Sequence, residues 1–291
     1  DPLAPLTRIK TDSGVASFGI GSNRTIVTAG KSANLSVWSS ENGKRLRSVT
    51  LTEKPIDVGA SVDGTRFYGI DRQGRLTVTP ADGGPARTVR IADARAIFGT
   101  VLAGDRLFVV HNQLRGNSHI RGYDVKTQIF DVDFSNRPFV RFDNAPDGSE
   151  FAVAFEGGGA ERYDGATGAL RQSIVDPAQD AAALANSNAE GGTVNYSMSG
   201  NKLLYRSVPA MHVVSLPSGS VVSNAVGESY RRGIAKISRD GTFVIDPSTR
   251  KKVDVATGKE LSSYALTRGD DRSLVWLSPR DDAFIIATAG R

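Results

Sequence analysis

The chain lacks cysteine and contains few of the other residues on which catalytic and metal sites depend. It has no cysteine and three histidines in 291 residues. The absence of cysteine excludes disulfide bonds, thiolate metal ligands and cysteine nucleophiles. It assigns no compartment, because cysteine-free proteins occur in both the cytoplasm and the periplasm, and the localisation stays open between these two.

Long apolar runs and a strong excess of one charge are also absent. The longest apolar stretches, such as FIIATA at 284–289, are far shorter than the roughly 20 residues that a membrane-spanning helix needs. The net charge is +5, and aromatic residues make up 7% of the chain. A nucleic-acid-binding protein usually carries a denser basic stripe with interleaved aromatic residues. We therefore expect neither a membrane span nor a nucleic-acid partner.

What the chain does contain is a repeat of about 41 residues. An apolar residue follows a turn-forming segment at seven places: Ile26, Phe67, Phe108, Phe151, Leu204, Phe243 and Phe284. The steps between these residues are 41, 41, 43, 53, 39 and 41. Repeats of about 40–45 residues are typical of the four-stranded blades of propellers. The spacing therefore predicts an all-β protein with seven blades.

Six of the repeats carry a second signal, in which an alternating strand, a turn and a second strand follow one another. These segments lie at 35–46, 76–86, 121–130, 161–170, 212–222 and 252–261. The pattern is that of a β-hairpin. We expect five turn glycines to adopt the positive φ that tight hairpin loops require: Gly43, Gly84, Gly168, Gly219 and Gly258.

The hairpin segments resemble the end of a WD40-type blade. In VDVATGKELSSYAL (253–266), an aspartate ends one strand and a T-G-K turn leads into the next. RYDGATGALRQSIV and GYDVKTQIFDVDF are similar, and SVWSSENGKRLRSVTL keeps Trp38 but has Ser39 in place of the aspartate. On these segments the chain resembles degenerate bacterial WD40-like repeat proteins. It departs from true WD40 repeats because it lacks their Gly-His pair and has too few histidines for their Asp-His-Ser/Thr-Trp network.

The resemblance implies one domain, a seven-bladed β-propeller over residues 1–291. We expect blades at 13–51, 52–91, 92–134, 135–175, 176–226, 227–266, and 267–291 plus 1–11. The fifth blade holds an insertion at 176–200, where the repeat departs from its usual step. Insertions in propellers map to loops, often on the binding face, although neutral drift in a tolerated loop is the competing interpretation.

The last repeat has no hairpin segment, and LTRIKT at 6–11 has the pattern of a lone outer strand. We expect this N-terminal strand to pair with the C-terminal blade and to cover its open edge. Three explanations of the missing strand remain: a three-stranded closing blade, a truncated chain, or a strand from elsewhere in a longer protein. The first residue is Asp1 rather than Met, so either a leader has been removed or the chain begins inside a longer protein. With the missing strand, this leads us to expect that the chain belongs to a larger protein.

Patterns typical of catalysis or metal binding are weak. His111 and His119 flank NQLRGNS in a predicted loop, His212 begins a predicted strand, and no third ligand follows at metal-site spacing. No G-x-S-x-G segment occurs, and the aspartates of the turns lack the spacing of a calcium loop. We therefore expect no catalytic residues, no metal and no cofactor.

One asymmetry in the charge remains. In a propeller, the loops after the second and fourth strands of each blade emerge on one face, and here they carry more basic than acidic residues. The candidate partner-binding residues of this basic face are Lys54, Arg72, Arg75, Arg95, Arg137, Arg141, Arg231, Arg232, Arg268 and Arg272. Arginine binds carboxylates and phosphates through two parallel hydrogen bonds. Ordinary solvated loop charge is the competing interpretation.

These observations predict a non-enzymatic protein-interaction scaffold, or a sensor or recruitment domain, that binds an acidic protein partner on the basic face. Other domains of the same parent chain are further candidate partners. The role rests on analogy with WD40-like propellers. The alternative is a propeller enzyme of the lactonase or hydrolase kind, or a small-ligand binder, with its site at the central channel. Several convergent His, Glu or Asp side chains from different blades would favour the enzyme.

Overall fold

The protein is described from a computed structural model. The described residues are 9, 17–20, 25–29, 33–61, 65–91, 97–113, 117–124, 127–136, 139–155, 159–174, 194–197, 199–207, 210–216, 218, 221–223, 235–246, 251–263, 274–277 and 284–287. The chain divides into two compact units, one of residues Ala4–Asp133 and the other of Phe134–Arg291 with Asp1–Leu3. Within the described ranges every regular element is a β-strand.

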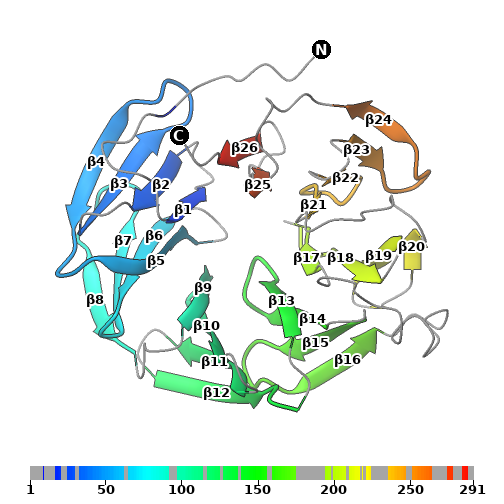
Figure 1. The fold of residues 1–291 in the computed structure, drawn as a ribbon, viewed down its shortest axis with the longest axis horizontal. Coiled ribbons are helices and arrows are strands. Elements are labelled where there is room, and N and C mark those ends of the chain that lie inside the picture. Colours follow the sequence, from blue (N-terminus) through cyan, green and yellow to red (C-terminus); the bar gives the residue numbers. More distant parts are fainter. Residues whose placement is uncertain are drawn as a thin grey trace. The chain divides into compact units, whose positions relative to one another are not determined.

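The unit Ala4–Asp133 contains three four-stranded antiparallel sheets, drawn from blue to green in Figure 1. Sheet A comprises β1 (Ser17–Ile20), β2 (Thr25–Ala29), β3 (Asn34–Ser39) and β4 (Arg45–Thr50). Sheet B comprises β5 (Pro55–Ala60), β6 (Arg66–Asp71), β7 (Arg75–Pro80) and β8 (Arg87–Arg90). Sheet C comprises β9 (Ile97–Ala103), β10 (Arg106–Gln113), β11 (Asn117–Asp124) and β12 (Thr127–Asp133). In each sheet, strands that follow one another in sequence are hydrogen-bonded neighbours.

The unit that contains Phe134–Arg291 repeats this arrangement (Figure 1). Sheet D comprises β13 (Phe139–Asn144), β14 (Glu150–Phe155), β15 (Ala160–Asp164) and β16 (Leu170–Ile174). Sheet E comprises β17 (Val194–Tyr196), β18 (Lys202–Ser207), β19 (Ala210–Ser215) and β20 (Val221–Ser223). Sheet F comprises β21 (Lys236–Ile237), β22 (Phe243–Asp246), β23 (Lys251–Asp254) and β24 (Glu260–Ser263). Sheet G has two described strands, β25 (Leu274–Leu277) and β26 (Phe284–Ala287).

The residues of the 41-residue repeat lie in the second strand of each sheet. Five of them are buried: Ile26, Phe67, Phe108, Phe151 and Leu204. Phe243 is half-buried, and the ammonium of Lys252 lies 3.7 Å from the centre of its ring. The repeat thus marks the strand whose side chains are most enclosed.

The core of each unit lies between successive sheets. In the first unit, Val37 of sheet A and Phe67 of sheet B belong to one apolar cluster. A second cluster contains Ile70 of sheet B together with Leu107 of sheet C. The other unit has equivalent clusters between sheets D and E and between sheets E and F. Within each unit, these sheets therefore bury apolar side chains against sheets that are adjacent to them in sequence, as stacked blades require.

The turns between first and second strands share one serine contact. Ser61, Ser197 and Ser238 each accept, through the side-chain oxygen, the backbone N–H of the residue five positions later, at 3.0, 3.1 and 3.0 Å. Serine side chains readily bond nearby backbone groups in this way. The recurrence of one contact in three sheets explains why similar short segments return along the sequence.

The turns between third and fourth strands follow the T-G-K pattern. Oδ1 of Asp254 accepts the backbone N–H and the hydroxyl of Thr257, both at 2.7 Å, and Asp164 holds Thr167 in the same way. Three of the expected turn glycines have positive φ: Gly43 at 69°, Gly168 at 71° and Gly258 at 67°. The expectation for Gly84 was wrong, because the positive φ in that turn, 102°, falls on Gly83. Gly219 lies outside the described residues.

The all-β architecture and its repeated four-stranded antiparallel sheets are confirmed. The described residues also form seven first-to-second strand pairs and six third-to-fourth strand pairs, the numbers that the turns and hairpin segments predict. The expected strand at 6–11, apart from Ile9, and most of the insertion at 176–200 lie outside the described residues. The closing contact of the N-terminal strand and the extent of a single domain over 1–291 stay predictions.

Burial in the second strands predicts a large difference between two identical substitutions in one unit. Leu204 has no exposed surface, whereas Leu261 in β24 is 54% exposed. We expect Leu204→Ala to lower the free energy of unfolding by about 2–5 kcal/mol, because it removes buried methyl groups and leaves a cavity. We expect Leu261→Ala to change it by less than about 0.5 kcal/mol. Urea denaturation of both variants measures the difference, and equal losses would contradict the assignment of the core.

Candidate functional site

Four of the ten predicted partner-binding residues fall within the described part of the chain. Lys54 precedes β5, Arg72 lies between β6 and β7, Arg75 begins β7, and Arg141 lies inside β13. Arg75 and Arg141 are therefore strand residues rather than loop residues. The remaining six lie outside the described residues: Arg95, Arg137, Arg231, Arg232, Arg268 and Arg272.

Lys54, Arg72 and Arg75 meet at one end of sheet B, which we call the basic edge and define as Glu53, Lys54, Asp71, Arg72, Gln73 and Arg75. β5 and β6 pair through Pro55 and Asp71, so the residues just beyond this pair, Lys54 and Arg72, lie at the same end of the sheet. Both side chains are exposed. Three of the predicted basic residues therefore lie at one end of sheet B.

Arg75 is held by two carboxylates of the basic edge. Its Nε donates to Oδ2 of the buried Asp71 at 2.6 Å, and a second guanidinium nitrogen lies 3.1 Å from Oε1 of Glu53. Oδ1 of Asp71 also accepts the backbone N–H groups of Gln73 and Arg75, at 2.9 and 3.0 Å. The hydrogen bond to Asp71 raises the pKa of Arg75. Arg75 therefore shapes the turn, and Lys54 and Arg72 carry the charge that a partner would meet.

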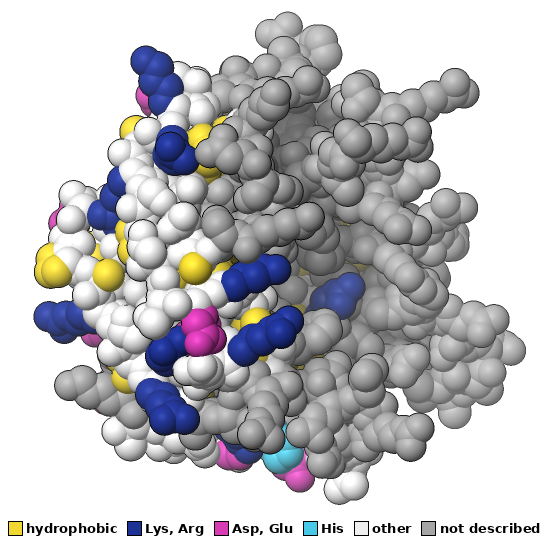
Figure 2. All heavy atoms as spheres, turned by 60° about the vertical axis from the view of Figure 1, so that its left-hand side comes forward, with side chains coloured by type: hydrophobic (Ala, Val, Ile, Leu, Met, Phe, Trp, Pro, Cys, Tyr) yellow, Lys and Arg dark blue, Asp and Glu magenta, His cyan; other side chains and the backbone are white. Residues whose placement is uncertain are grey.

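The charges on the visible face are interspersed rather than merged. Figure 2 shows the described Lys and Arg side chains standing apart from one another, with acidic side chains next to some of them. Among the described residues on this face, the basic side chains therefore form no continuous stripe of the kind that a polyanion would follow.

Carboxylates on the first strands connect neighbouring sheets, and the sequence analysis did not identify them. Oδ2 of Asp57 in β5 accepts the backbone N–H of Thr100 in β9 at 2.8 Å and the Thr100 hydroxyl at 2.7 Å. The hydroxyl of Tyr68 donates to the carbonyl oxygen of Thr100. Burial, followed by the Asp57 charge, raises the pKa of Tyr68 well above its usual range. Asp57 and Tyr68 of sheet B thus both bind Thr100 and link sheet B to sheet C at this one residue.

Asp143 makes the same kind of link in the other unit. Its Oδ2 accepts the backbone N–H of Tyr196 at 2.7 Å and the side-chain N–H of Asn195 at 2.8 Å, both in β17. Oδ1 of Asn195 accepts the backbone N–H of Ile237 in β21 at 2.9 Å. Burial is the largest effect on Asp143 and raises its pKa. In β5 and β17, a single polar side chain among apolar neighbours was the signal in the sequence, whereas β13 also holds Arg141 and Asn144 and gives no such signal for Asp143.

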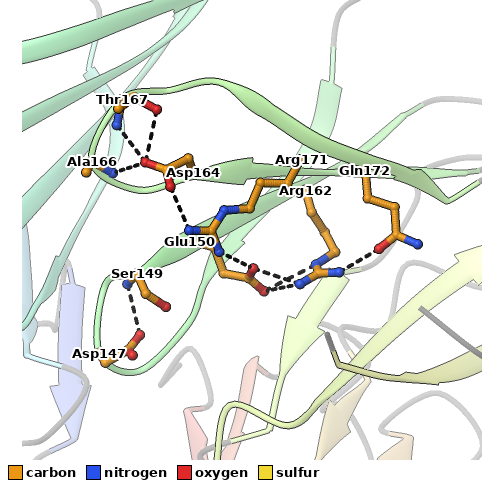
Figure 3. A network of polar contacts seen from close by, with 9 residues as sticks. All are labelled: Asp147, Ser149, Glu150, Arg162, Asp164, Ala166, Thr167, Arg171 and Gln172. Atoms are coloured by element: carbon orange, nitrogen blue, oxygen red, sulfur yellow. Dashed lines mark hydrogen bonds and ion pairs between the residues drawn. The ribbon is translucent and has the colours of Figure 1, made fainter. Parts of the chain in front are cut away.

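Glu150 is the centre of a buried ion cluster in sheet D (Figure 3). Its carboxylate and the guanidinium of Arg162 are about equally buried, with 6% and 5% of their side-chain surfaces exposed. Arg162 donates to Oε2 at 2.8 Å and to Oε1 at 3.0 and 3.2 Å, and Arg171 donates to Oε2 at 3.0 Å. Arg162 also donates to the amide oxygen of Gln172 at 2.5 Å.

Arg171 links this cluster to the hairpin turn of sheet D. It donates to Oδ2 of Asp164 at 2.6 Å, while Oδ1 of Asp164 accepts the backbone N–H groups of Ala166 and Thr167 (Figure 3). The hydrogen bond from Arg171 is the largest of the effects that hold the pKa of Asp164 well below its usual range. The cluster joins β14, β15 and β16, so its charges are satisfied within one sheet.

The histidines lie in strands, and the expectation that His111 and His119 flank a loop was wrong. They face each other directly across β10 and β11. Nδ1 of His119 lies 2.9 Å from Oδ1 of Asp131, whose Oδ2 accepts from Nε of Arg121 at 2.8 Å. The ring of His212 stacks on Tyr205, with 5.2 Å between the ring centres. The two strands extend into the predicted loop from either side, with Gln113 paired to Asn117.

The described residues contain neither a cluster suited to a metal ion nor a long apolar helix. No group of three or more His, Cys, Asp or Glu side chains in that part of the chain has the arrangement of a metal site. The same residues include no helix with the length and apolar character needed to cross a membrane.

Comparison with protein-family models and with curated protein sequences finds no match. Among solved structures, the chain is similar to hydrazine synthase of Kuenenia stuttgartiensis, with a TM-score of 0.64 and 11% sequence identity. The alignment covers 97% of this chain and 95% of that chain. At this level of identity the likeness concerns the fold alone. Together with the repeated four-stranded sheets, it supports a β-propeller-like architecture.

The buried cluster predicts a large difference between two Glu→Gln substitutions. We expect Glu150→Gln to lower the free energy of unfolding by about 3 kcal/mol, because it leaves the buried Arg162 without its counter-charge. Glu260 in β24 pairs with Lys251 at 2.8 Å, but both side chains are more than 40% exposed. We therefore expect Glu260→Gln to cost less than about 1 kcal/mol. Denaturation of both variants measures this, and similar losses would show that Glu150 is not held as described.

Asp164 and Asp143 predict opposite dependences of stability on pH. The pKa of Asp164 is lowered in the folded state, so its stabilising contribution is present above the ordinary aspartate value of about 3.9 and is lost as the pH falls below it. The pKa of Asp143 is raised, so its contribution is present at low pH and is lost as the pH rises through the raised value.

We expect the stability of wild type relative to Asp164→Asn to shrink as the pH is lowered from 7 to about 3. Relative to Asp143→Asn, the stability of wild type should grow over the same range. Urea denaturation at a series of pH values tests both expectations. If both stability differences rose, or both fell, as the pH was lowered, the opposite pKa shifts assigned to Asp164 and Asp143 would be wrong.

Proposed function

We propose that the chain is a seven-bladed, WD40-like β-propeller, closed by its N-terminal strand, that acts as a non-enzymatic scaffold or recruitment domain. On this proposal it belongs to a larger protein and binds an acidic protein partner on the face that carries the basic edge. The repeated sheets and the likeness in fold support the propeller. The partner and the role are inferred from the charges.

The observation that carries the proposal is the exposure of Lys54 and Arg72 beside the neutralised Arg75. Asp71 and Glu53 hold Arg75 in place and thereby stiffen the turn that presents Arg72. Lys54 and Arg72 stand exposed at the same end of the sheet. A rigid element that presents exposed cations favours rapid capture of an acidic surface, and such contacts are strongest at low ionic strength.

A pair of charge-reversed variants tests the proposal. The first combines Lys54→Glu with Arg72→Glu. The matched control combines Lys44→Glu with Lys259→Glu, which reverses two exposed lysines in hairpin turns and changes the net charge equally. The wild type and both variants are immobilised, and proteins captured from an extract of the source organism at low salt are quantified by mass spectrometry.

We expect the same acidic proteins on the wild type and on the control, and roughly tenfold less of them on the Lys54 and Arg72 variant. The capture should fall as salt is raised, because exposed charges are screened. Equal capture by the two variants would remove the basic edge from the proposal.

A further inference from the structure

The six four-stranded sheets differ in how regularly the fourth strand, at the edge of each sheet, pairs with the third. In five of the six four-stranded sheets, the pairing between third and fourth strands is interrupted by a register shift. These shifts lie at Val37/Trp38, Gly122/Tyr123, Arg162/Tyr163, Val213/Val214 and Lys252/Val253. A β-bulge bends and twists an edge strand, and proteins use this to prevent further strands from adding to it.

Sheet B is the exception among the six. β7 and β8 pair without a shift from Arg75 opposite Arg90 to Val78 opposite Arg87. β8 ends the strand order of its sheet, as Figure 1 shows, and three of its four residues are exposed. This strand is therefore a regular and uncovered edge within the described part of the chain.

The backbone groups that face outward from β8 can be assigned. The N–H of Ile91 donates to the carbonyl oxygen of Gly74, which lies on the β7 side. Because successive residues of a strand point their backbone groups to opposite sides, Val89 also faces β7, whereas Thr88 and Arg90 face outward. The hydroxyls of Thr77 and Thr88 lie 3.2 Å apart, which agrees with an outward-facing Thr88 backbone. In an antiparallel pair, side chains approach most closely where the two residues exchange no backbone hydrogen bonds.

The two arginines of β8 favour an added strand that carries negative charge. Arg87 and Arg90 are exposed, and neither has an ion pair with any described residue. They are three residues apart, so one arginine lies on each face of the edge. A second copy of β8 would place arginines beside arginines, which is unfavourable. An added strand with carboxylates would meet a guanidinium on either face.

We propose that β8 binds an extended acidic peptide, which adds to sheet B as a fifth strand. The outward backbone groups of Thr88 and Arg90 form main-chain hydrogen bonds with the peptide, and Arg87 and Arg90 pair with its carboxylates. Strand addition of this kind derives affinity from main-chain bonds and specificity from side chains. Arg90 lies opposite Arg75 of the basic edge, so the two surfaces adjoin at that end of sheet B, whereas Arg87 lies opposite Val78, farther along β8.

The probe for this proposal is a short synthetic peptide in which pairs of glutamates alternate with pairs of valines, so that both faces of the added strand carry carboxylates. Two control peptides carry lysine in place of glutamate, or proline in place of one central valine. Binding is measured by fluorescence anisotropy with the full chain, and amide hydrogen exchange with and without the peptide reports on individual strands. The variants are Arg87→Glu with Arg90→Glu, Arg87→Gln with Arg90→Gln, and Thr88→Pro, which removes an outward donor at an edge position where proline is tolerated.

We expect the wild type to bind the glutamate peptide and neither control peptide. The glutamine variant should bind several-fold more weakly, and the glutamate variant and Thr88→Pro roughly tenfold or more weakly. Exchange at Thr88 and Arg90 should slow when the peptide binds. The Lys54→Glu and Arg72→Glu variant should bind the peptide as the wild type does, which separates this proposal from the proposed function.

Several results would overturn the proposal. Binding that survives both arginine variants, or that leaves exchange at Thr88 and Arg90 unchanged, would place the peptide elsewhere. Tight binding of the proline-containing peptide would indicate charge attraction without strand addition. Self-association that depends on Arg87 and Arg90 would make a second copy of the chain the occupant.

Discussion

The packing of each antiparallel sheet against the next is the interaction on which the rest of this structure depends. A four-stranded sheet of short strands has two faces and cannot bury both by itself. Within each unit, clusters such as the one around Val37 and Phe67 fill the space between neighbouring sheets. The aromatic and aliphatic residues of the repeat have no exposed surface in four of the sheets because neighbouring sheets enclose them.

Polar side chains then determine how neighbouring sheets are aligned. Asp57, Asp143 and Asn195 each reach from the first strand of one sheet to a backbone N–H of the next first strand. Lys202, which begins a second strand, donates to the carbonyl oxygen of Gly241 in the turn of the following sheet at 3.1 Å, and Arg66 reaches Gly104 in the same manner. Apolar packing is non-directional, whereas these bonds have defined partners. They therefore supply a register between sheets that hydrophobic contact alone does not specify.

The basic residues of the structure fall into two groups: those paired with carboxylates inside their own sheet, and those exposed to solvent and available to a partner. Arg75, Arg162 and Arg171 are paired with carboxylates inside their own sheets. Lys54, Arg72, Arg87 and Arg90 are exposed, the first two beside β5 and β6 and the other two on β8. A count of basic residues along the sequence does not make this distinction. The two proposals rest on the charges that remain after the structural pairs have been assigned.

Much of the fold follows from local patterns in the sequence. The 41-residue spacing, the serine and Asp-Gly turns and the T-G-K hairpins predict the strands, because alternation and turn geometry are decided by residues close together in the chain. The misassigned Gly84 shows the limit of such reasoning, since either of two adjacent glycines can supply the positive φ. His111 and His119 were misplaced because the polar segment between them is also compatible with paired strands.

Contacts between residues far apart in the sequence were decided by the tertiary structure. Asp57 and Thr100 are 43 residues apart and Asp143 and Tyr196 are 53 apart, so no local pattern couples them. The burial of Glu150 between two arginines and the regular edge of β8 likewise depend on the register between strands. The sequence by itself determined the repeating strand units and the residues that their turns require. The tertiary structure decided which charges are neutralised and which are exposed, because pairing depends on distances that arise only when the sheets have formed and packed.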